Sequence, residues 1–465
     1  MSRIFAVVLS LFTFYLGTAQ INQYGIPLIK NYPPEITKGS EQNWAIVQDH
    51  RGIIYAGNDE EGILEFDGHE WRTIPIPNKS MVRSLAVGED GTVYAGAVAD
   101  FGHLKPDATG NLHYESLLPH LDSSFYNFAD VWKTYFHNGK AYFCSTNSFF
   151  IYDPDSREIE VVDPHKHTLF GFIESDQFYA GSYTEGLMVV EDDTTRALPG
   201  GEHYKLKNIF ALVRFDDNRL LIGTPESGFS LYNTKTGEVD STFASGRANR
   251  FARQNLISHL LALPESRFLI STQNGGLATM NREGELEEII TKSDGIQDRT
   301  VYYSYMNPGG GYNDPVWSAL SIGISRVNLN SPFRVFRENS GFLGLINTIE
   351  RLDDDLYIGT KTGLYKLTFP SGKAEFQRVG NSKRTVWDLQ KFDLGTHGEV
   401  LLTAFEEGIA LLHPNGKIEF IDQKVRNKKQ YQDSKYKSYI IYRNRFEPSR
   451  VYLGLRNNIA YLHYQ

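Results

Sequence analysis

The chain has 465 residues and a formal net charge of −9, with 41 % hydrophobic and 22 % charged residues. This is a globular composition, and the excess of Tyr (27) and Phe (29) favours β-sheet. The acidic balance argues against nucleic acid or an anionic membrane surface as a partner. The only cysteine, Cys144, excludes an intramolecular disulfide, and its apolar setting AYFCST predicts a buried thiol rather than a nucleophile.

Residues 1–19 are predicted to be a secretory signal peptide. They contain Arg3, an apolar stretch from Ile4 to Leu16 and small residues up to Ala19. A retained membrane anchor is the alternative, but the stretch is short for one, and no later window has the ~20 apolar residues that a membrane helix needs. We therefore expect a periplasmic or secreted mature chain without a membrane segment.

One phrase recurs along the chain: two short apolar runs around a loop, first seen as IIYAGNDEEGILEF at Ile53. Nine intervals separate the equivalent residues Gly57 and Gly454, so the period is about 44 residues. A period of this size with strands only is typical of propeller blades. In the first copy, NWAIVQD, IIYAG, GILEFD and HEWRTIPIP are the four expected strands, and the glycine ending the second suits close backbone approach. No window beyond the signal shows sustained helical periodicity.

Ten repeats exceed the 4–8 blades of a usual ring. The sequence therefore predicts an all-β protein with a lead-in segment at 20–41, a seven-bladed propeller at 42–339 and three blades of an incomplete second propeller at 340–465. The insert YMNPGGGYNDP in the seventh repeat supports a seam near its end. A single ring of ten blades is the alternative.

Several phrases resemble the exported sensor region of Bacteroidetes two-component regulator propeller proteins. They are the lead-in GIPLIKNY, QNW at the first blade, EFDGHEW, VRSLAVGEDGTVYAG, FGHLKPD, FADVW and EGLMVVED. The resemblance covers essentially the whole mature chain and is most specific in its first hundred residues. It implies a ligand-sensing role upstream of a triple-tyrosine domain, a membrane helix and a histidine kinase or helix-turn-helix output module. Because none of these follows here, the chain is expected to be a fragment or truncated product.

Most candidate chemical sites are weak. His165 and His167 could face the same way as metal ligands, but no third ligand is evident, so no metal and no cofactor is expected. The NPGGGY stretch lacks the helix and Lys-Ser/Thr of a phosphate-binding loop and is predicted to be a flexible insert. The tryptophans could stack on sugars, but packing between blades is expected for most of them: Trp44, Trp71, Trp132, Trp317 and Trp387.

The loops joining second to third strands are the remaining candidate. They should converge on the face that carries the connections between blades, and in the first seven blades they contain six acids and no Lys or Arg: Asp59, Glu60, Glu61, Asp100, Glu185 and Glu226. The alternative is that these acids only confer solubility. As a binding site, they predict an electronegative mouth for neutral oligosaccharides or cations.

Two classes of function compete. The first is a non-catalytic ligand-sensing propeller of a regulatory protein, responsive to a small molecule or oligosaccharide and able to form a homodimer through its second propeller. The second is an exported glycan hydrolase or lyase, because fold does not determine function. An enzyme should carry catalytic groups at different positions in different blades, whereas these acids are largely repeat-equivalent, which favours sensing.

Overall fold

The computed structural model describes residues 25–464 except 147, 164–167, 192, 371–373, 382, 407 and 422–436. The predicted signal peptide and the pair His165 and His167 lie outside the described residues. The chain divides between Arg334 and Val335 into two compact units, Ile26–Arg334 and Val335–Gln465, called the first and second unit below. Ten antiparallel sheets make up the described part of the chain, which confirms the predicted all-β propeller class.

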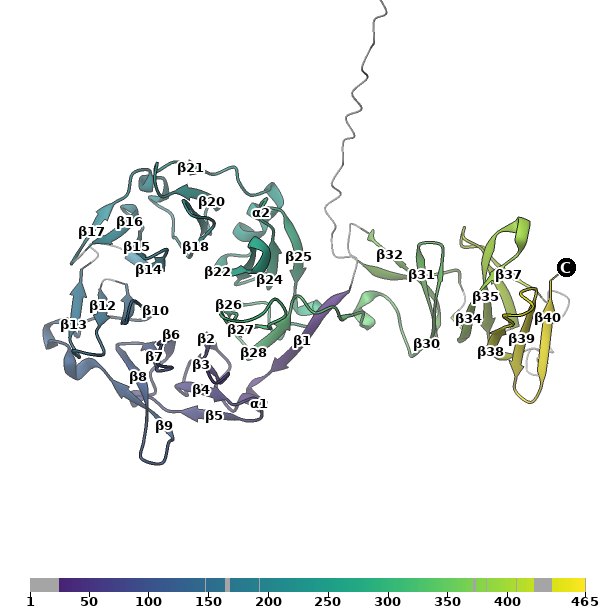
Figure 1. Ribbon diagram of the computed structural model, residues 1–465, viewed down its shortest axis with the longest axis horizontal. Helices are drawn as coiled ribbons and strands as arrows, with labels where there is room; N and C mark the ends of the chain where they lie inside the picture. The colour runs from purple at the N-terminus through teal and green to yellow at the C-terminus, as the bar shows by residue number, and fades with distance from the viewer. Residues whose placement is uncertain are drawn as a thin grey trace, which may run out of the picture. The chain divides into compact units, whose positions relative to one another are not determined.

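Seven of the sheets form a closed circle in the first unit (Figure 1). Each inner strand contacts the next one, and the last, β26, contacts the first, β2. Ten sheets around one axis would not bring these two strands together. The inner strands are β2 (Asn43–Gln48), β6 (Val82–Val87), β10 (Val131–His137), β14 (Thr168–Glu174), β18 (Ala211–Arg214), β22 (Ile257–Leu263) and β26 (Val301–Tyr305).

The other strands of each sheet follow outward in chain order. The second strands are β3 (Ile54–Asn58), β7 (Val93–Ala97), β11 (Lys140–Ser145), β15 (Gln177–Ser182), β19 (Arg219–Thr224), β23 (Arg267–Thr272) and β27 (Val316–Leu320). The third strands are β4 (Ile63–Phe66), β8 (Asp100–Pro106), β12 (Phe149–Tyr152), β16 (Gly186–Glu191), β20 (Gly228–Asn233), β24 (Leu277–Met280) and β28 (Ile324–Asn328). The outer strands of the first six sheets are β5 (Trp71–Ile74), β9 (Leu112–Ser116), β13 (Ile159–Val162), β17 (Thr194–Ala197), β21 (Val239–Asp240) and β25 (Leu286–Ile290).

The seventh sheet takes its fourth strand from the beginning of the chain. Strand β1 (Ile26–Tyr32) pairs antiparallel with β28, with Leu28 opposite Asn328, and the short β29 (Arg334–Val335) follows it at the edge. The sequence predicted a lead-in outside the ring at 20–41, whereas residues 26–32 complete the last sheet. Only a contact between distant parts of the chain reveals this role.

Tyr32, at the end of β1, anchors the closure. It is 3 % exposed, and its ring centroid lies 5.5 Å from that of Trp71 in the first sheet and 5.5 Å from that of Trp317 in the seventh. Phe66 of the first sheet completes the cluster at 5.4 Å. Aromatic contacts therefore connect the two ends of the ring.

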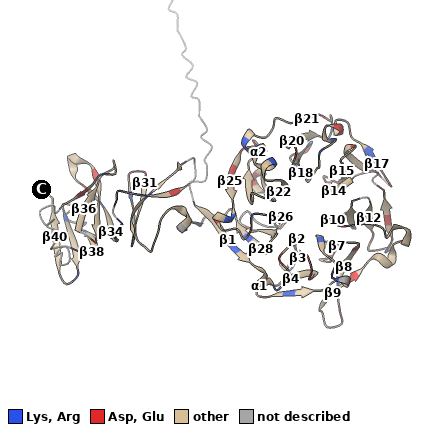
Figure 2. Cartoon of the chain, turned by 180° about the vertical axis from the view of Figure 1, so that it is seen from behind, with Lys and Arg blue, Asp and Glu red and all other residues tan. Residues whose placement is uncertain are grey.

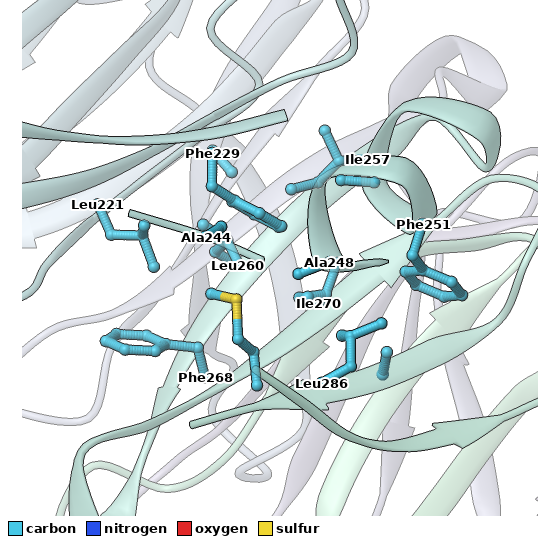
Figure 3. Packing of buried hydrophobic residues seen from close by; sticks show 14 of the residues in the cluster. Leu221, Phe229, Ala244, Ala248, Phe251, Ile257, Leu260, Phe268, Ile270 and Leu286 are labelled. Carbon is cyan, nitrogen blue, oxygen red and sulfur yellow. The ribbon is translucent and has the colours of Figure 1, made fainter. Parts of the chain in front are cut away.

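Hydrophobic cores lie between adjacent sheets. Figure 3 shows one of them, where Leu221 and Phe229 of the fifth sheet meet Leu260 and Ile270 of the sixth. Gly57 illustrates how closely the sheets approach, because a Cβ atom there would lie 2.6 Å from the carbonyl oxygen of Val82 in the next inner strand. The glycine predicted for close approach thus faces the neighbouring blade.

The sequence did not predict the nine-residue helix α2 (Gly246–Gln254), which connects the fifth and sixth sheets and packs Ala248, Phe251 and Ala252 into this core. Ser245 caps it by accepting a hydrogen bond from the Ala248 N–H at 3.2 Å. The apolar spacing i, i+3, i+4 was the available signal. A shorter helix, α1 (Pro34–Thr37), follows β1.

The second unit contains three sheets of the same type. They are β30 (Ile346–Leu352), β31 (Asp355–Thr360), β32 (Gly363–Thr368) and β33 (Glu375–Arg378); β34 (Val386–Asp393), β35 (Glu399–Phe405), β36 (Gly408–Leu412) and β37 (Ile418–Phe420); and β38 (Ser438–Arg443), β39 (Arg450–Leu455) and β40 (Ile459–His463). Whether they begin a second ring stays a prediction.

Candidate functional site: the channel of the first unit

A channel with a volume of about 1030 Å³ runs between the inner strands of the first unit. All seven inner strands or the residues directly before them contribute to its lining. Its size lies at the upper end of the range for ligand-binding cavities. The channel is therefore large enough for an oligosaccharide-sized ligand.

A repeated backbone irregularity supplies many of the side chains that line the channel. Six of the inner strands carry a β-bulge, in which one extra residue interrupts the pairing with the second strand. The extra residue and the next one both line the channel, which regular alternation would not allow. In the order of the sheets, the pairs are Trp44 and Ala45, Arg83 and Ser84, Trp132 and Lys133, Leu169 and Phe170, Ser258 and His259, and Tyr302 and Tyr303.

Four of the six extra residues contact one another in a group that we call the aromatic collar: Tyr302, Trp44, Arg83 and Trp132. The rings of Trp44 and Tyr302 stack with centroids 4.1 Å apart. The Arg83 guanidinium lies 4.0 Å from the Trp44 centroid and 4.8 Å from that of Trp132, a cation–π arrangement with both. Asp130 fixes it by accepting a hydrogen bond from Arg83 Nε at 2.6 Å. Within the described part of the chain, the buried Nη1 of Arg83 has no acceptor.

Lys133 extends from the third inner strand across the channel. Its Nζ lies 5.4 Å from the ring centroid of Phe170 and 5.6 Å from that of Tyr303, which belongs to the seventh sheet. No carboxylate of the described residues forms an ion pair with it. The surrounding strands partly remove Lys133 from water, and this burial lowers its pKa to about 8.

The groups around Lys133 are neutral near pH 7. Burial, followed by the charge of Lys133, holds the pKa of His259 well below its usual value, and its ring lies 4.1 Å from that of Tyr303. Burial raises the pKa of Tyr303 to about 12 and also raises those of the Tyr135 hydroxyl and the Cys144 thiol. Cys144 is fully buried, as the sequence predicted.

Glu174 and the loop between β26 and β27 also line the channel. Burial raises the pKa of Glu174 to about 7. The loop contributes Met306, Asn307, Pro308 and Gly310, so the glycine-rich insert of the sequence is part of the lining. Glu174 is the one carboxyl among the described lining residues.

None of the six acidic residues predicted as a ligand site lines the channel. Asp59 contacts a lining residue, because its Oδ1 accepts a hydrogen bond from Trp44 Nε1 at 3.2 Å and so positions a member of the aromatic collar. Glu60 and Glu61 are exposed in the same loop. Ligand binding by these acids stays a prediction.

The other three acids have different surroundings. Asp100 is 9 % exposed and accepts a hydrogen bond from Ser116 Oγ at 2.7 Å, and burial raises its pKa. Glu185 lies 3.7 Å from Lys205 Nζ, and Glu226 accepts hydrogen bonds from the backbone and side chain of Asn208. The predicted loop acids are therefore not a uniform set, and Lys205 offsets part of their charge. Figure 2 shows acidic and basic segments interspersed around the first unit.

The tryptophans also divide into two groups. Trp71 and Trp317 pack between sheets as the sequence predicted, with 5 % and 6 % exposure. Trp44 and Trp132 instead line the channel. In the sequence, Trp44 and Trp132 each stand near the start of the first strand of a repeat. Strand alternation alone could not indicate that a bulge directs these side chains into the channel.

The described residues contain neither a candidate metal site nor a candidate membrane-spanning helix. No group of three or more His, Cys, Asp or Glu side chains in the described ranges could hold a metal ion. No helix formed by those residues has the length and apolar character to span a membrane.

The fold is shared with extracellular parts of bacterial regulators. The extracellular domain of the putative hybrid two-component system BT3049 from B. thetaiotaomicron has a TM-score of 0.64 at 16 % identity, over 94 % of this chain and 59 % of that one. That of the putative one-component system BT4673 from the same organism has a TM-score of 0.53 at 17 % identity, over 95 % and 59 %. The chain thus spans about three fifths of these structures.

A propeller from another context is also similar. The WD40 β-propeller domain of Doa1 has a TM-score of 0.50 at 12 % identity, over 66 % of this chain and 98 % of that one. No protein-family model matches the sequence, and no curated protein matches it. These similarities therefore establish the fold.

Proposed function

We propose that this chain is a ligand-sensing part of an extracellular region of a two-component-type regulator, and that it is periplasmic or secreted, non-catalytic and responsive to a carbohydrate. The observation that carries the proposal is the channel, a large cavity lined by the aromatic collar and by polar side chains. The structural similarity to extracellular domains of regulators supports the same role. The signal would pass to an output module of a longer protein.

Filling the channel tests this role. Ala262 lines the channel with an exposed side chain, so Ala262→Trp adds bulk there without overpacking a core. Ala108→Trp, on the exposed turn between β8 and β9, is the matched control. Calorimetry on residues 20–465 with neutral and acidic oligosaccharides should show micromolar binding that Ala262→Trp abolishes and Ala108→Trp retains. No binding of any oligosaccharide would overturn the proposed function.

An exported glycan hydrolase or lyase is the second candidate. The raised pKa of Glu174 suits a general acid or base, and perturbed groups cluster at active sites. Glycoside hydrolases use a pair of carboxyl groups, however, and Glu174 has no second carboxyl beside it in the described lining. Release of reducing ends or of unsaturated sugars from any glycan would favour the enzyme.

A further inference from the structure

The strongest unexplained feature of the channel is its uncompensated positive charge. Buried charges in proteins are normally paired. Lys133 Nζ has two aromatic rings near it and, among the described residues, no carboxylate partner. Arg83 is paired with Asp130 through Nε, yet its buried Nη1 lacks an acceptor.

Both groups line the same cavity and come from adjacent inner strands, β6 and β10. Glu174, the one acidic lining residue in the described part, interacts with Arg214 instead. The channel lining therefore contains two cationic side chains, and it favours a ligand group that carries negative charge.

We propose that the channel of the first unit selects an anionic sugar, with Lys133 Nζ donating to its carboxylate or sulfate and Arg83 adding positive charge to the same lining. This inference rests on the proposed function, since it names the class of ligand for the same site. It differs from the neutral oligosaccharides that the acidic loops predict, because those acids lie outside the channel lining. The remaining aromatic and apolar edges of the lining contact the uncharged part of the sugar.

The first experiment compares ligands that have nearly the same shape but differ in charge. The probes are uronate oligosaccharides containing galacturonate, glucuronate or mannuronate, the carboxyl-reduced neutral form of each, and sulfated disaccharides. The parent should bind at least one anionic probe and bind its neutral counterpart about 10- to 150-fold more weakly, the range for a hydrogen bond to a charged group. Preference for uronate over sulfate, or the reverse, identifies the anion.

The second experiment removes the cation. Lys133→Met keeps the length of the side chain. It should lower the affinity for the anionic probe about 10- to 150-fold without changing the affinity for the neutral form. Lys235→Met, which removes an exposed charge from the turn after β20, is the control and should bind like the parent. If the Lys133→Met variant and the parent have the same affinity for the anionic probe, the proposal is overturned.

The pH dependence separates direct contact from a structural role. The titratable groups facing Lys133 are Cys144 on β11, His259 on β22, Tyr303 on β26 and Tyr135 on its own strand, and their pKa shifts keep all four neutral from pH 7 to 9. Glu174 lines the same channel, and its pKa of about 7 places its change of charge below that of Lys133. Since Lys133 loses its charge around pH 8, affinity for the anion should fall by up to about tenfold per pH unit above pH 8.

The Lys133→Met variant should not show this fall in affinity for the anionic probe above pH 8. Equal affinity for anionic and neutral probes, or a parent without pH dependence between 7 and 10, would overturn the anionic selectivity while leaving carbohydrate sensing intact. Failure of every sugar, charged or neutral, would instead overturn the proposed function itself.

Discussion

The first sheets of the two units have the same strand order but very different surroundings. In β2, Ala45, Ile46 and Val47 are at most 5 % exposed, because β26 and β6 lie on either side. In β30, Ile346 and Ile349 are 44 % and 59 % exposed. The same repeat thus buries its faces only when another sheet covers them, as expected for repeat proteins.

The β-bulges of the inner strands occur in both units. All three sheets of the second unit have a bulge at the same place in the first strand, with Asn347, Trp387 and Tyr439 as the extra residues. The ring centroids of Trp387 and Tyr439 lie 5.0 Å apart, so extra residues of neighbouring sheets contact each other here as they do in the aromatic collar. The bulge and its large extra residue are therefore local features that form in each sheet by itself. A channel, in contrast, forms only where inner strands surround a common axis.

The largest effect is expected from breaking the closure of the first unit. Tyr32→Ala removes the ring that connects the first and seventh sheets and should lower the free energy of unfolding by about 3–5 kcal/mol. Chemical denaturation measures this. Tyr442→Ala, at a 62 % exposed position of the second unit, is the control and should change stability by less than about 0.5 kcal/mol. Equal effects of the two substitutions would refute closure by β1.

Hydrogen exchange compares the units directly. Amides of β22 and β23, covered on both sides, should exchange about 100-fold more slowly than those of β38 to β40, a difference of about 3 kcal/mol in opening free energy. Mass spectrometry of peptic fragments gives this ratio. Uniform protection across both units would show that the exposed faces of the second unit are covered in solution.

Lys133→Met should stabilise the first unit. The folded-state pKa of about 8 lies below the ordinary value of 10.5, so the charged form is disfavoured on folding. This penalty is complete below pH 8 and disappears as pH rises from 8 to 10.5. At pH 7 we expect a gain of about 1–3 kcal/mol after screening by water in the channel, and almost none at pH 10.5. Unfolding curves at the two pH values test the sign, with Lys235→Met as the unchanged control.

The smallest effect on stability is expected on β40. Ile459 is 80 % exposed, so Ile459→Lys should alter the free energy of unfolding by no more than about 0.5 kcal/mol. If the predicted homodimer forms through the second unit, the charge should reduce self-association in sedimentation experiments. Ile36→Lys, at 52 % exposure in the first unit, is the control. Unchanged association of the Ile459 variant would exclude this edge as the contact.

The sequence by itself determined the blade, because a strand is a local pattern. The alternating apolar runs, the turn glycines and the 44-residue period predicted the all-β propeller class and most strands of the first sheet. Cys144 was predictable for the same reason, since its neighbours in the strand are apolar.

Only the tertiary structure decided where the chemistry lies. β1 joins β28 across almost 300 positions, and Lys133 meets Phe170 and Tyr303 from three different sheets. Conversely, Asp100 belongs to a loop by sequence pattern but is buried beside Ser116. The repeat specifies each sheet, while a channel is a property of inner strands that converge around an axis. No local pattern could therefore place Lys133 in the channel lining.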